Sequence, residues 1–483
     1  MLSVAKQGVM TPCPYRGKTY RRKNKASNII DNKMKEEFLY YLWENRLIGK
    51  NLQTAEGESL EVVATGYRNT NSGPDFLEAK IKIGDKLWAG HVEIHVKSSD
   101  WNRHHHQTDK AYQNVILHVV YENDAKVNGI PTLELKGQFD ESLFTQYERL
   151  VSTKSWIPCE RSISQVAVFT RLSWLDRMAI ERLESKSNTV TKILEANQYD
   201  WEDALYKLVM RYFGLKVNNE AFETLASLLP FKTLLKHSDN LLQIEAMLLG
   251  CAGFLENDFT DDYPLLLKRE FSVMRAKFNL LVMPEERWKF LRMRPSNFPT
   301  LRLAQMAQLI HRNGCLFSKI REAKNVAEVK ALFDVKASEY WDMHYRFEKR
   351  LPQCERLPQC DSPTPGPVGL SYNGSRKMPK HLGDATADIL IINAVVPLLF
   401  CYGKLHKNES VCETAMRFLE QTEAEDNAII RHYASCGIAA DNAMQSQALL
   451  HLYSSYCKRK RCLECRIGNV LLKQPNPETP TQR

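Results

Sequence analysis

The clearest pattern of hydrophobic and polar positions lies just after the first helical segment of the chain. Residues Phe76 to Ile83 and Lys86 to Lys97 both alternate with a period of two, and Gly84-Asp85 between them is typical of a hairpin turn. Apolar residues of the second stretch point to one face of a strand. The opposite face carries the polar residues His91, Glu93, His95 and Lys97. The pattern therefore predicts two antiparallel strands, the second of which presents an acid beside histidines and a lysine.

The segments around this hairpin complete a predicted α/β domain over residues 34–150. Apolar spacing predicts a helix over Lys33–Asn45, strands over Leu60–Tyr67 and Val115–Tyr121, a short helix over Arg103–Gln113, and a hairpin or edge strand over Asn123–Leu135. The order of the first six elements is α-β-β-β-α-β.

The rest of the chain has helical periodicity and few strand signals. We predict a flexible basic arm (1–33), a helical domain (165–350), a proline-rich linker (351–380), a C-terminal helical region (381–472) and a polar tail (473–483). An alternative for the arm is that Met34 is the native first residue.

A candidate metal site follows from the hairpin and the turn before it. Asp75, in Gly73-Pro74-Asp75-Phe76, immediately precedes the first of the two strands. Because Mg²⁺ prefers carboxylate oxygens, Asp75 and Glu93 are predicted to hold Mg²⁺ or Mn²⁺, with His95 positioning the attacking water and Lys97 serving the phosphate. In a second arrangement His95 is a ligand, which favours Mn²⁺, and Lys97 serves the water. A third interpretation is a surface ion pair between Glu93 and Lys97.

These motifs resemble the PD-(D/E)xK nuclease superfamily over roughly residues 34–135. Pro74-Asp75 matches the first half of that motif, and the order of elements matches its core. The resemblance implies a restriction-endonuclease-like fold in which Asp75 and Glu93 bind one or two Mg²⁺ ions and a lysine activates water. The second half departs from the family, because Glu93 and Lys97 are four residues apart rather than two. A degenerate, inactive core is therefore a second interpretation.

Histidines cluster in sequence just after the second strand of the hairpin. His104, His105 and His106 are either contacts for phosphate or metal or, as we favour for His104 and His105, part of an exposed polar helix. His118, between apolar neighbours, is either a core histidine or a residue beside the site. Glu37 on the first helix is a candidate outer acid.

Three cysteines near the C-terminus have a spacing typical of metal ligands. Cys457, Cys462 and Cys465 form C-x4-C-x2-C, which suits Zn²⁺ or an iron–sulfur cluster with a structural role. The fourth ligand is either Cys436 or Cys159. With Cys159, the arrangement resembles iron–sulfur nucleases of the RecB and CRISPR-adaptation type, although the order of the gaps is reversed. The alternative is a set of unrelated thiols.

Two basic groups are candidate nucleic-acid contacts in a chain of net charge +9. They are Lys458, Arg459, Lys460 and Arg461 between the cysteines, and Arg292, Arg294 and Arg302 around a proline-containing turn. The alternatives are a solvated turn for the first group and pairing with Glu285 and Glu286 for the second.

The composition also excludes some function classes. The first 30 residues are basic and contain no apolar secretory region, and the 12 cysteines are irregularly spaced, which together predict a cytoplasmic protein. No apolar run approaches the length of about 20 residues that spans a bilayer, so we expect no membrane partner. No P-loop is present, which argues against ATP-driven unwinding.

Over most of its length the chain resembles an uncharacterised bacterial family, found mostly in Bacteroidetes and classed as DUF2851. The resemblance rests on Asn71 to Phe76, Trp88 to Trp101, Asp109 to Glu122, Arg292 to Gln305 and Tyr456 to Gly468. It brings no established activity. From the residues we predict a metal-dependent nuclease that prefers DNA. The alternatives are an inactive nuclease-fold protein that binds nucleic acid or acts as a scaffold, and a metal-dependent hydrolase of another phosphate substrate.

Overall fold

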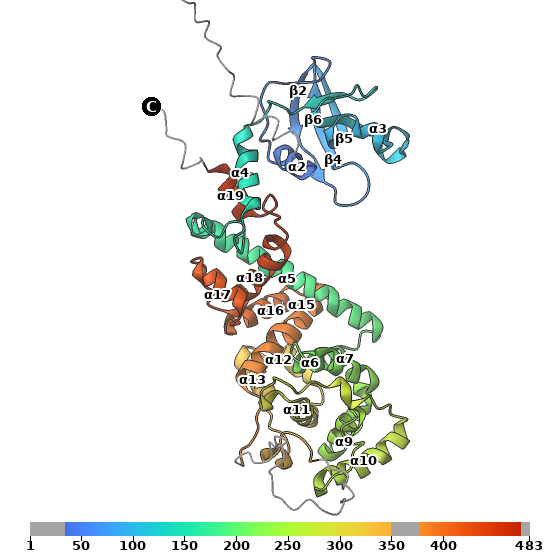
Figure 1. Cartoon of the computed structure of the whole chain (residues 1–483). Helices are drawn as coiled ribbons and strands as arrows, with labels where there is room; N and C mark the ends of the chain where they lie inside the picture. The colour runs from blue at the N-terminus through green and yellow to red at the C-terminus, as the bar shows by residue number, and fades with distance from the viewer. Residues whose placement is uncertain (1–33, 349–376, 475–483) are drawn as a thin grey trace, which may run out of the picture. The chain divides into compact units, whose positions relative to one another are not determined.

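The computed structural model of the chain describes residues 34–348 and 377–474 (Figure 1). Two compact units are formed, the first by Met1–Glu160 with Lys460–Arg483 and the second by Arg161–Arg459. The first unit is a mixed α/β structure with a sheet, and the second is helical. The predicted arm, residues 351–376 of the predicted linker, and residues 475–483 of the predicted tail lie outside the described residues.

A seven-stranded sheet forms the centre of the first unit. In spatial order its strands are β1 (Leu52–Gln53), β2 (Ser59–Ala64), β4 (Phe76–Ile83), β5 (Lys86–Lys97), β6 (Val115–Glu122) and β7 (Thr132–Glu134), and β3 (Tyr67–Arg68) pairs with β4. Neighbours from β1 to β5 run antiparallel, whereas β5 with β6 and β6 with β7 run parallel. The two strands of the predicted hairpin begin and end where the alternation predicts, and the segment after β6 supplies a parallel edge strand rather than a hairpin.

One apolar core joins the sheet to the helices of this unit. Helix α2 (Glu36–Glu44) contacts β5 and buries Phe38, Leu42 and Trp43. Helix α4 (Glu141–Ser152) lies beside α19 (Arg466–Lys473), and Leu472 of α19 belongs to the same core (Figure 1). The C-terminal helix thus completes a core that is formed mainly by residues near the start of the chain.

A bulge distorts β4 directly after Asp75. The register pairs Phe76 with Val92 but Ala79 with Gly90, so that two residues of β4 oppose one residue of β5. One of the two, Glu78, has a positive φ of 58°. Bulges next to functional sites commonly redirect a side chain, and this bulge lies close to Asp75 in the chain.

The chain after β5 does not form the single helix predicted over Arg103–Gln113. It forms α3 (Asp100–Arg103) and two short 3₁₀ turns, η1 (His106–Thr108) and η2 (Lys110–Tyr112). The helix stops because His105 takes the left-handed conformation, with φ 62° and ψ 26°. Asp109 then takes an extended conformation, and its side chain accepts a hydrogen bond from the N–H of Ala111.

The second unit consists of helices around its own apolar core. They are α5 (Val168–Ala196), α6 (Trp201–Phe213), α7 (Asn219–Leu228), α8 (Phe231–Leu235), α9 (Leu241–Cys251), α10 (Asp262–Phe278), α11 (Pro299–Arg312), α12 (Leu316–Glu322), α13 (Val326–Phe333), α14 (Asp384–Leu390), α15 (Val396–Leu405), α16 (Glu409–Gln421), α17 (Ala428–Ser435) and α18 (Ala443–His451). Two π-helical segments, η7 (Ile391–Val395) and η8 (Leu452–Cys457), interrupt or extend them.

One continuous helical stretch is more apolar than we expected from the sequence. Asp384–Leu405, which comprises α14, η7 and α15, has 22 residues and contains an 18-residue window with a mean hydropathy of 1.9, enough by length and composition to cross a membrane. The expectation that no apolar run approaches this length was therefore wrong. Its most apolar window is 72% buried inside the structure, as in the core helix of a globular unit, and one such helix is weak support for a membrane span.

Candidate functional site

The two carboxylates predicted to bind a metal lie next to each other. The N–H of Asp75 donates to Oε2 of Glu93 at 3.1 Å, and the N–H of Ile94 donates to Oδ2 of Asp75 at 3.0 Å. Each carboxylate is therefore held by the backbone of the strand that carries the other. The antiparallel pairing of β4 with β5 produces this exchange, as the hairpin predicts.

Burial and mutual repulsion make these carboxyl groups hard to ionise. Glu93 is 5% exposed, and burial, followed by the charge of Asp75, raises its pKa to about 9. Burial also raises the pKa of Asp75, against the opposing effects of the Ile94 N–H and the Tyr40 hydroxyl. The surface ion pair of Glu93 with Lys97 is excluded by the burial of Glu93.

A third acid, Glu36 in the first turn of α2, belongs to the same site. Burial, and then the charges of Asp75 and Asp100, raise the pKa of Glu36 to about 7. Tyr40, one helical turn later on the same face, donates its hydroxyl to Asp75. The sequence reading had suggested Glu37, which is exposed. The four-residue spacing of Glu36 and Tyr40, which places both on one face of the helix, is a signal that could have identified Glu36.

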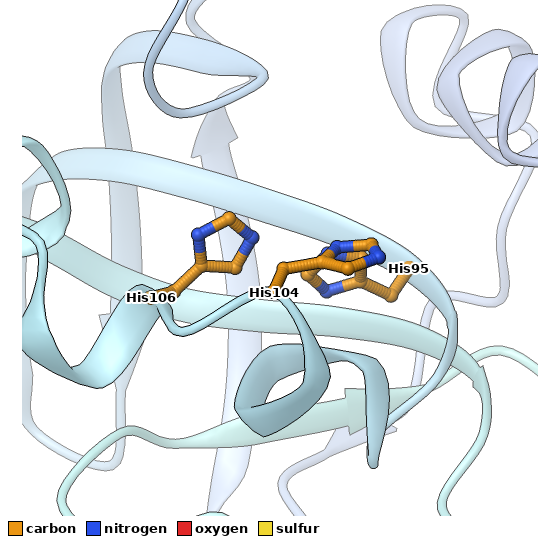
Figure 2. Close-up of side chains that lie close together, drawn as sticks. All are labelled: His95, His104 and His106. Carbon is orange, nitrogen blue, oxygen red and sulfur yellow. The ribbon is translucent and has the colours of Figure 1, made fainter.

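Three imidazoles gather beside Glu93 (Figure 2). His95 on β5 and His104 and His106 after α3 place their ligand nitrogens within 4.8 Å of one another. Nε2 of His95 lies 3.2 Å from Nδ1 of His104 and 3.4 Å from Oε1 of Glu93. Nε2 of His106 also lies 3.4 Å from Oε1 of Glu93. The residue His104 is exposed, as predicted, but its ring turns into the group.

Two of these imidazoles, His95 and His106, have little tendency to carry a proton. Burial, with the neighbouring imidazoles His118, His106 and His104, lowers the pKa of His95 to about 2. Burial also lowers the pKa of His106, an effect increased by His104 and opposed by Asp109. At neutral pH both rings are uncharged, and a neutral imidazole nitrogen is a good ligand for a transition metal.

His118 supports this group from the neighbouring strand. Parallel pairing places it beside Glu93, and its Nε2 lies 2.9 Å from Nδ1 of His95. It is fully buried, and burial lowers its pKa to about 4. His118 is therefore both a core histidine and a neighbour of the site, the two interpretations that the sequence left open.

The predicted lysine lies apart from these groups. The side chain of Lys97 is 51% exposed, and its Nζ lies 4.0 Å from Oδ2 of Asp124. Asp124 in turn accepts hydrogen bonds from Ser98 and Ser99 at the end of β5. The alternation predicts a side chain on the same face as Glu93, but at the end of the strand this residue turns toward solvent.

The predicted nucleic-acid contacts differ in their accessibility. Arg292, Arg294, Lys458, Arg459 and Lys460 are exposed, and Arg461 is half-buried and pairs with Glu464. Arg302 is 3% exposed and donates to Gln305, Asn297 and Thr386, so its guanidinium serves the interior of the helical unit. We therefore leave Arg302 out of any surface that contacts nucleic acid.

The predicted cysteine ligands are all buried but are divided between the two units. Cys159, Cys462 and Cys465 belong to the first unit and Cys457 to the second. Cys436, the alternative ligand, belongs to the second unit and is half-buried. A Zn²⁺ ion or iron–sulfur cluster at these residues stays a prediction.

Comparison with known proteins gives one family. A family model described as "Protein of unknown function (DUF2851)" matches residues 36–357 and 371–428. The matched residues include the carboxylates and the imidazoles described above. Neither the curated proteins nor the solved structures give a match.

Proposed function

The chain belongs to the DUF2851 family of proteins of unknown function, and on that premise we propose that its first unit is a metal-dependent phosphodiesterase acting on nucleic acid, with DNA as the preferred substrate. The substrate would be cleaved at the site formed by Glu36, Asp75 and Glu93. The helical unit would add basic surface for the phosphate backbone, including Arg292 and Arg294.

One observation carries this proposal: two adjacent carboxylates are buried together, and although the charge of Arg68 lowers the pKa of Asp75, burial raises it more. Among the described residues, neither Asp75 nor Glu93 forms an ion pair with a lysine or arginine. Burying acids in this way is costly unless a cation offsets their charge. A divalent metal ion is a suitable cation, because the donors are hard carboxylate oxygens.

The residues fit Mg²⁺ or Mn²⁺, and each of them has a separate role. When bound, such an ion polarises a phosphoryl oxygen and acidifies a coordinated water. Asp75 and Glu93 hold the ion, and their backbone hydrogen bonds fix the carboxylates in place. Glu36, with a pKa of about 7, is suited to accept the proton of the attacking water near neutral pH. Tyr40 orients Asp75, and Lys97 adds positive charge for the substrate.

The arrangement of the sheet supports a PD-(D/E)xK-like core. Strands β2, β4 and β5 are adjacent and antiparallel, β6 follows β5 in parallel, and α2 contacts β5. This is the strand order that the sequence resemblance implies, although only α3 and two 3₁₀ turns stand where it implies a helix between β5 and β6. Asp75 precedes the second of these strands and Glu93 lies on the third, as in that superfamily.

Cleavage of mixed single- and double-stranded DNA and RNA tests the proposal. We expect the full chain to cleave at least one substrate with Mg²⁺ or Mn²⁺, and Asp75→Asn to abolish cleavage. Asp85→Asn is the matched control, because it removes one negative charge from an exposed turn. No cleavage by folded wild-type protein with either metal would overturn the proposal.

A second candidate function is supported by the position of Lys97. In an active PD-(D/E)xK core a lysine serves the water, whereas this lysine is exposed and close to Asp124. An inactive fold that binds nucleic acid would tolerate such a change. That protein would bind DNA in a salt-sensitive manner, with equal affinity in wild type and Asp75→Asn, and would cleave none of the substrates.

A further inference from the structure

We propose that the first unit binds a divalent transition-metal ion, with Zn²⁺ as the best fit, through the imidazoles of His95, His104 and His106 and the carboxylate of Glu93. The inference goes beyond the proposed function. It concerns a nitrogen-rich site distinct in chemistry from an all-carboxylate Mg²⁺ site, and it holds whether or not nucleic acid is cleaved.

Three of the contacts between the donor atoms have the spacing of tetrahedral coordination. With metal–ligand bonds of about 2.0–2.1 Å, neighbouring ligands of a tetrahedral Zn²⁺ ion lie roughly 3.3–3.4 Å apart. Three of the distances between these donors are close to this value: 3.2 Å from His95 to His104, and 3.4 Å from Glu93 to each of His95 and His106. The ligand nitrogens of the three imidazoles lie within 4.8 Å of one another, and Figure 2 shows the three rings gathered together.

The hydrogen bonding of the rings leaves the correct nitrogens open. Nε2 of His118 lies 2.9 Å from Nδ1 of His95, and the tautomer of His95 with its proton on Nδ1 would donate to His118 and present the Nε2 lone pair to the ion. Nε2 of His106 is buried and has no hydrogen-bond partner among the described residues. A buried nitrogen without a hydrogen-bond partner is unfavourable, and a bound metal would satisfy it.

Local backbone strain brings two of the ligands together. His105 lies between His104 and His106 and takes the left-handed conformation, which is uncommon for a residue other than glycine. The side chain of His105 is exposed and is not part of the group. A helix continuing through these residues would point consecutive side chains about 100° apart, whereas the kink lets both neighbours reach the same centre.

Aromatic side chains hold the rings in this arrangement. Tyr112 stacks on His106 with ring centroids 3.8 Å apart, and Trp101 contacts both His106 and His118 edge-on or tilted. A cluster of imidazoles that was merely exposed to solvent would not need such support. Glu93 links the two parts of the site, since Oε1 faces the imidazoles and Oε2 accepts the N–H of Asp75.

Titration with Co²⁺ alone tests the inference, because tetrahedral Co²⁺ absorbs visible light far more strongly than octahedral Co²⁺. The full chain is first stripped with a chelator. We expect an intense visible spectrum that saturates at one ion per chain and that Zn²⁺ abolishes. His104→Ala and His106→Ala should each lose it, while circular dichroism confirms that they are folded.

Two controls test whether the spectrum comes from the histidine site. His105→Asn alters the middle histidine of the same run, and asparagine tolerates the left-handed conformation, so this variant should retain the spectrum. Ion bound by cysteine thiolates would add near-ultraviolet charge-transfer absorption that the histidine variants leave unchanged. An octahedral spectrum, or a tetrahedral one unaffected by both histidine variants, would overturn the inference.

The Co²⁺ titration and the cleavage assay test the histidine site and the proposed nuclease separately. Co²⁺ binding without cleavage would retain the histidine site and reject the nuclease. Mg²⁺-dependent cleavage that requires Asp75 but survives in His104→Ala, together with absent tetrahedral Co²⁺, would retain the nuclease and reject the histidine site.

Discussion

Nδ1 of His95 and Nε2 of His118 lie 2.9 Å apart across two parallel strands, with both rings buried. The second nitrogen of His95 faces His104 and Glu93, and we infer that the contact with His118 favours the tautomer of His95 that has its proton on Nδ1. His118 does not itself reach these donors through its remaining nitrogen, which has no partner among the described residues. Its role is therefore to position a ligand rather than to supply one.

Replacing His118 should weaken metal binding without removing any ligand. His118→Leu leaves the Nδ1–H of His95 without an acceptor, and loss of such a partner typically lowers metal affinity about 10–100-fold. His118→Gln places an amide oxygen near the lost nitrogen and should restore most of the affinity. Competition between Co²⁺ and a chelating dye measures both variants. Equal affinity in His118→Leu and wild type would argue against the positioning role.

The hairpin of this site was predictable to the residue, but the histidine group was not. Strict alternation and Gly84-Asp85 defined β4 and β5, and their pairing brought Asp75 to Glu93. The approach of His104 to His95 depends on the backbone of a single residue, His105, and local propensity does not specify its left-handed conformation. The predicted helix was wrong at that point for the same reason.

Contacts between segments that are far apart in the chain could not be predicted from the sequence either. The periodicity predicted that the second unit is helical, which the structure confirms. Nothing local to α19 indicated that Leu472 would join the core of the first unit, because an amphipathic pattern shows which face is buried but not against which partner.

Gly66 should be essential for the bulge that aims Asp75. It has φ 82°, and a Cβ at this position would lie 2.4 Å from the carbonyl oxygen of Leu77 on the bulged strand. Gly66→Ala should destabilise the first unit by about 2–4 kcal/mol, combining left-handed strain with the steric overlap. Gly57→Ala is the matched control: its φ is 89° but nothing lies within 4 Å, so only the strain of about 1–2 kcal/mol is expected. Urea unfolding of both variants measures the difference, and equal losses would contradict the steric argument.

A half-buried lysine, Lys186, should make the stability of the second unit depend on pH. Nζ of Lys186 lies 2.9 Å from Oδ1 of Asn393 and 2.7 Å from Oε1 of Gln447. Burial, and then the charge of Arg182, lower its pKa to about 7, whereas Glu425 opposes the shift. Because the ordinary pKa is 10.5, the unfolded chain binds more protons between these values. The free energy of unfolding should therefore rise with pH from about 7 to about 10.

Lys186→Met provides the comparison for that pH dependence. Methionine fills similar volume and carries no proton, so the rise in stability across this pH range should be smaller in the variant than in wild type. Lys404→Met removes an exposed lysine of the same unit and should leave the slope unchanged. Denaturant unfolding at pH 7, 8.5 and 10 measures the slopes. Parallel slopes for wild type and Lys186→Met would show that another group titrates.

Asp75→Asn should make the metal-free protein more stable near neutral pH while it removes activity. The pKa of Glu93 is raised above its ordinary value, so the stability that this carboxyl group contributes is present below pH 4.5 and is lost as the pH rises toward 9. The charge of Asp75 is the second cause of that shift after burial, and removing it should make the loss shallower. Thermal unfolding after chelation, at pH 5.5, 7 and 8.5, should show a smaller fall in stability for Asp75→Asn than for wild type or Asp85→Asn.

Saturating Mg²⁺ should make wild type more stable than Asp75→Asn, because only the wild-type pair of carboxylates binds the cation. The gain is about 2.7 kcal/mol at a hundredfold excess over the dissociation constant. If Mg²⁺ stabilised both proteins equally, Asp75 would not be a ligand.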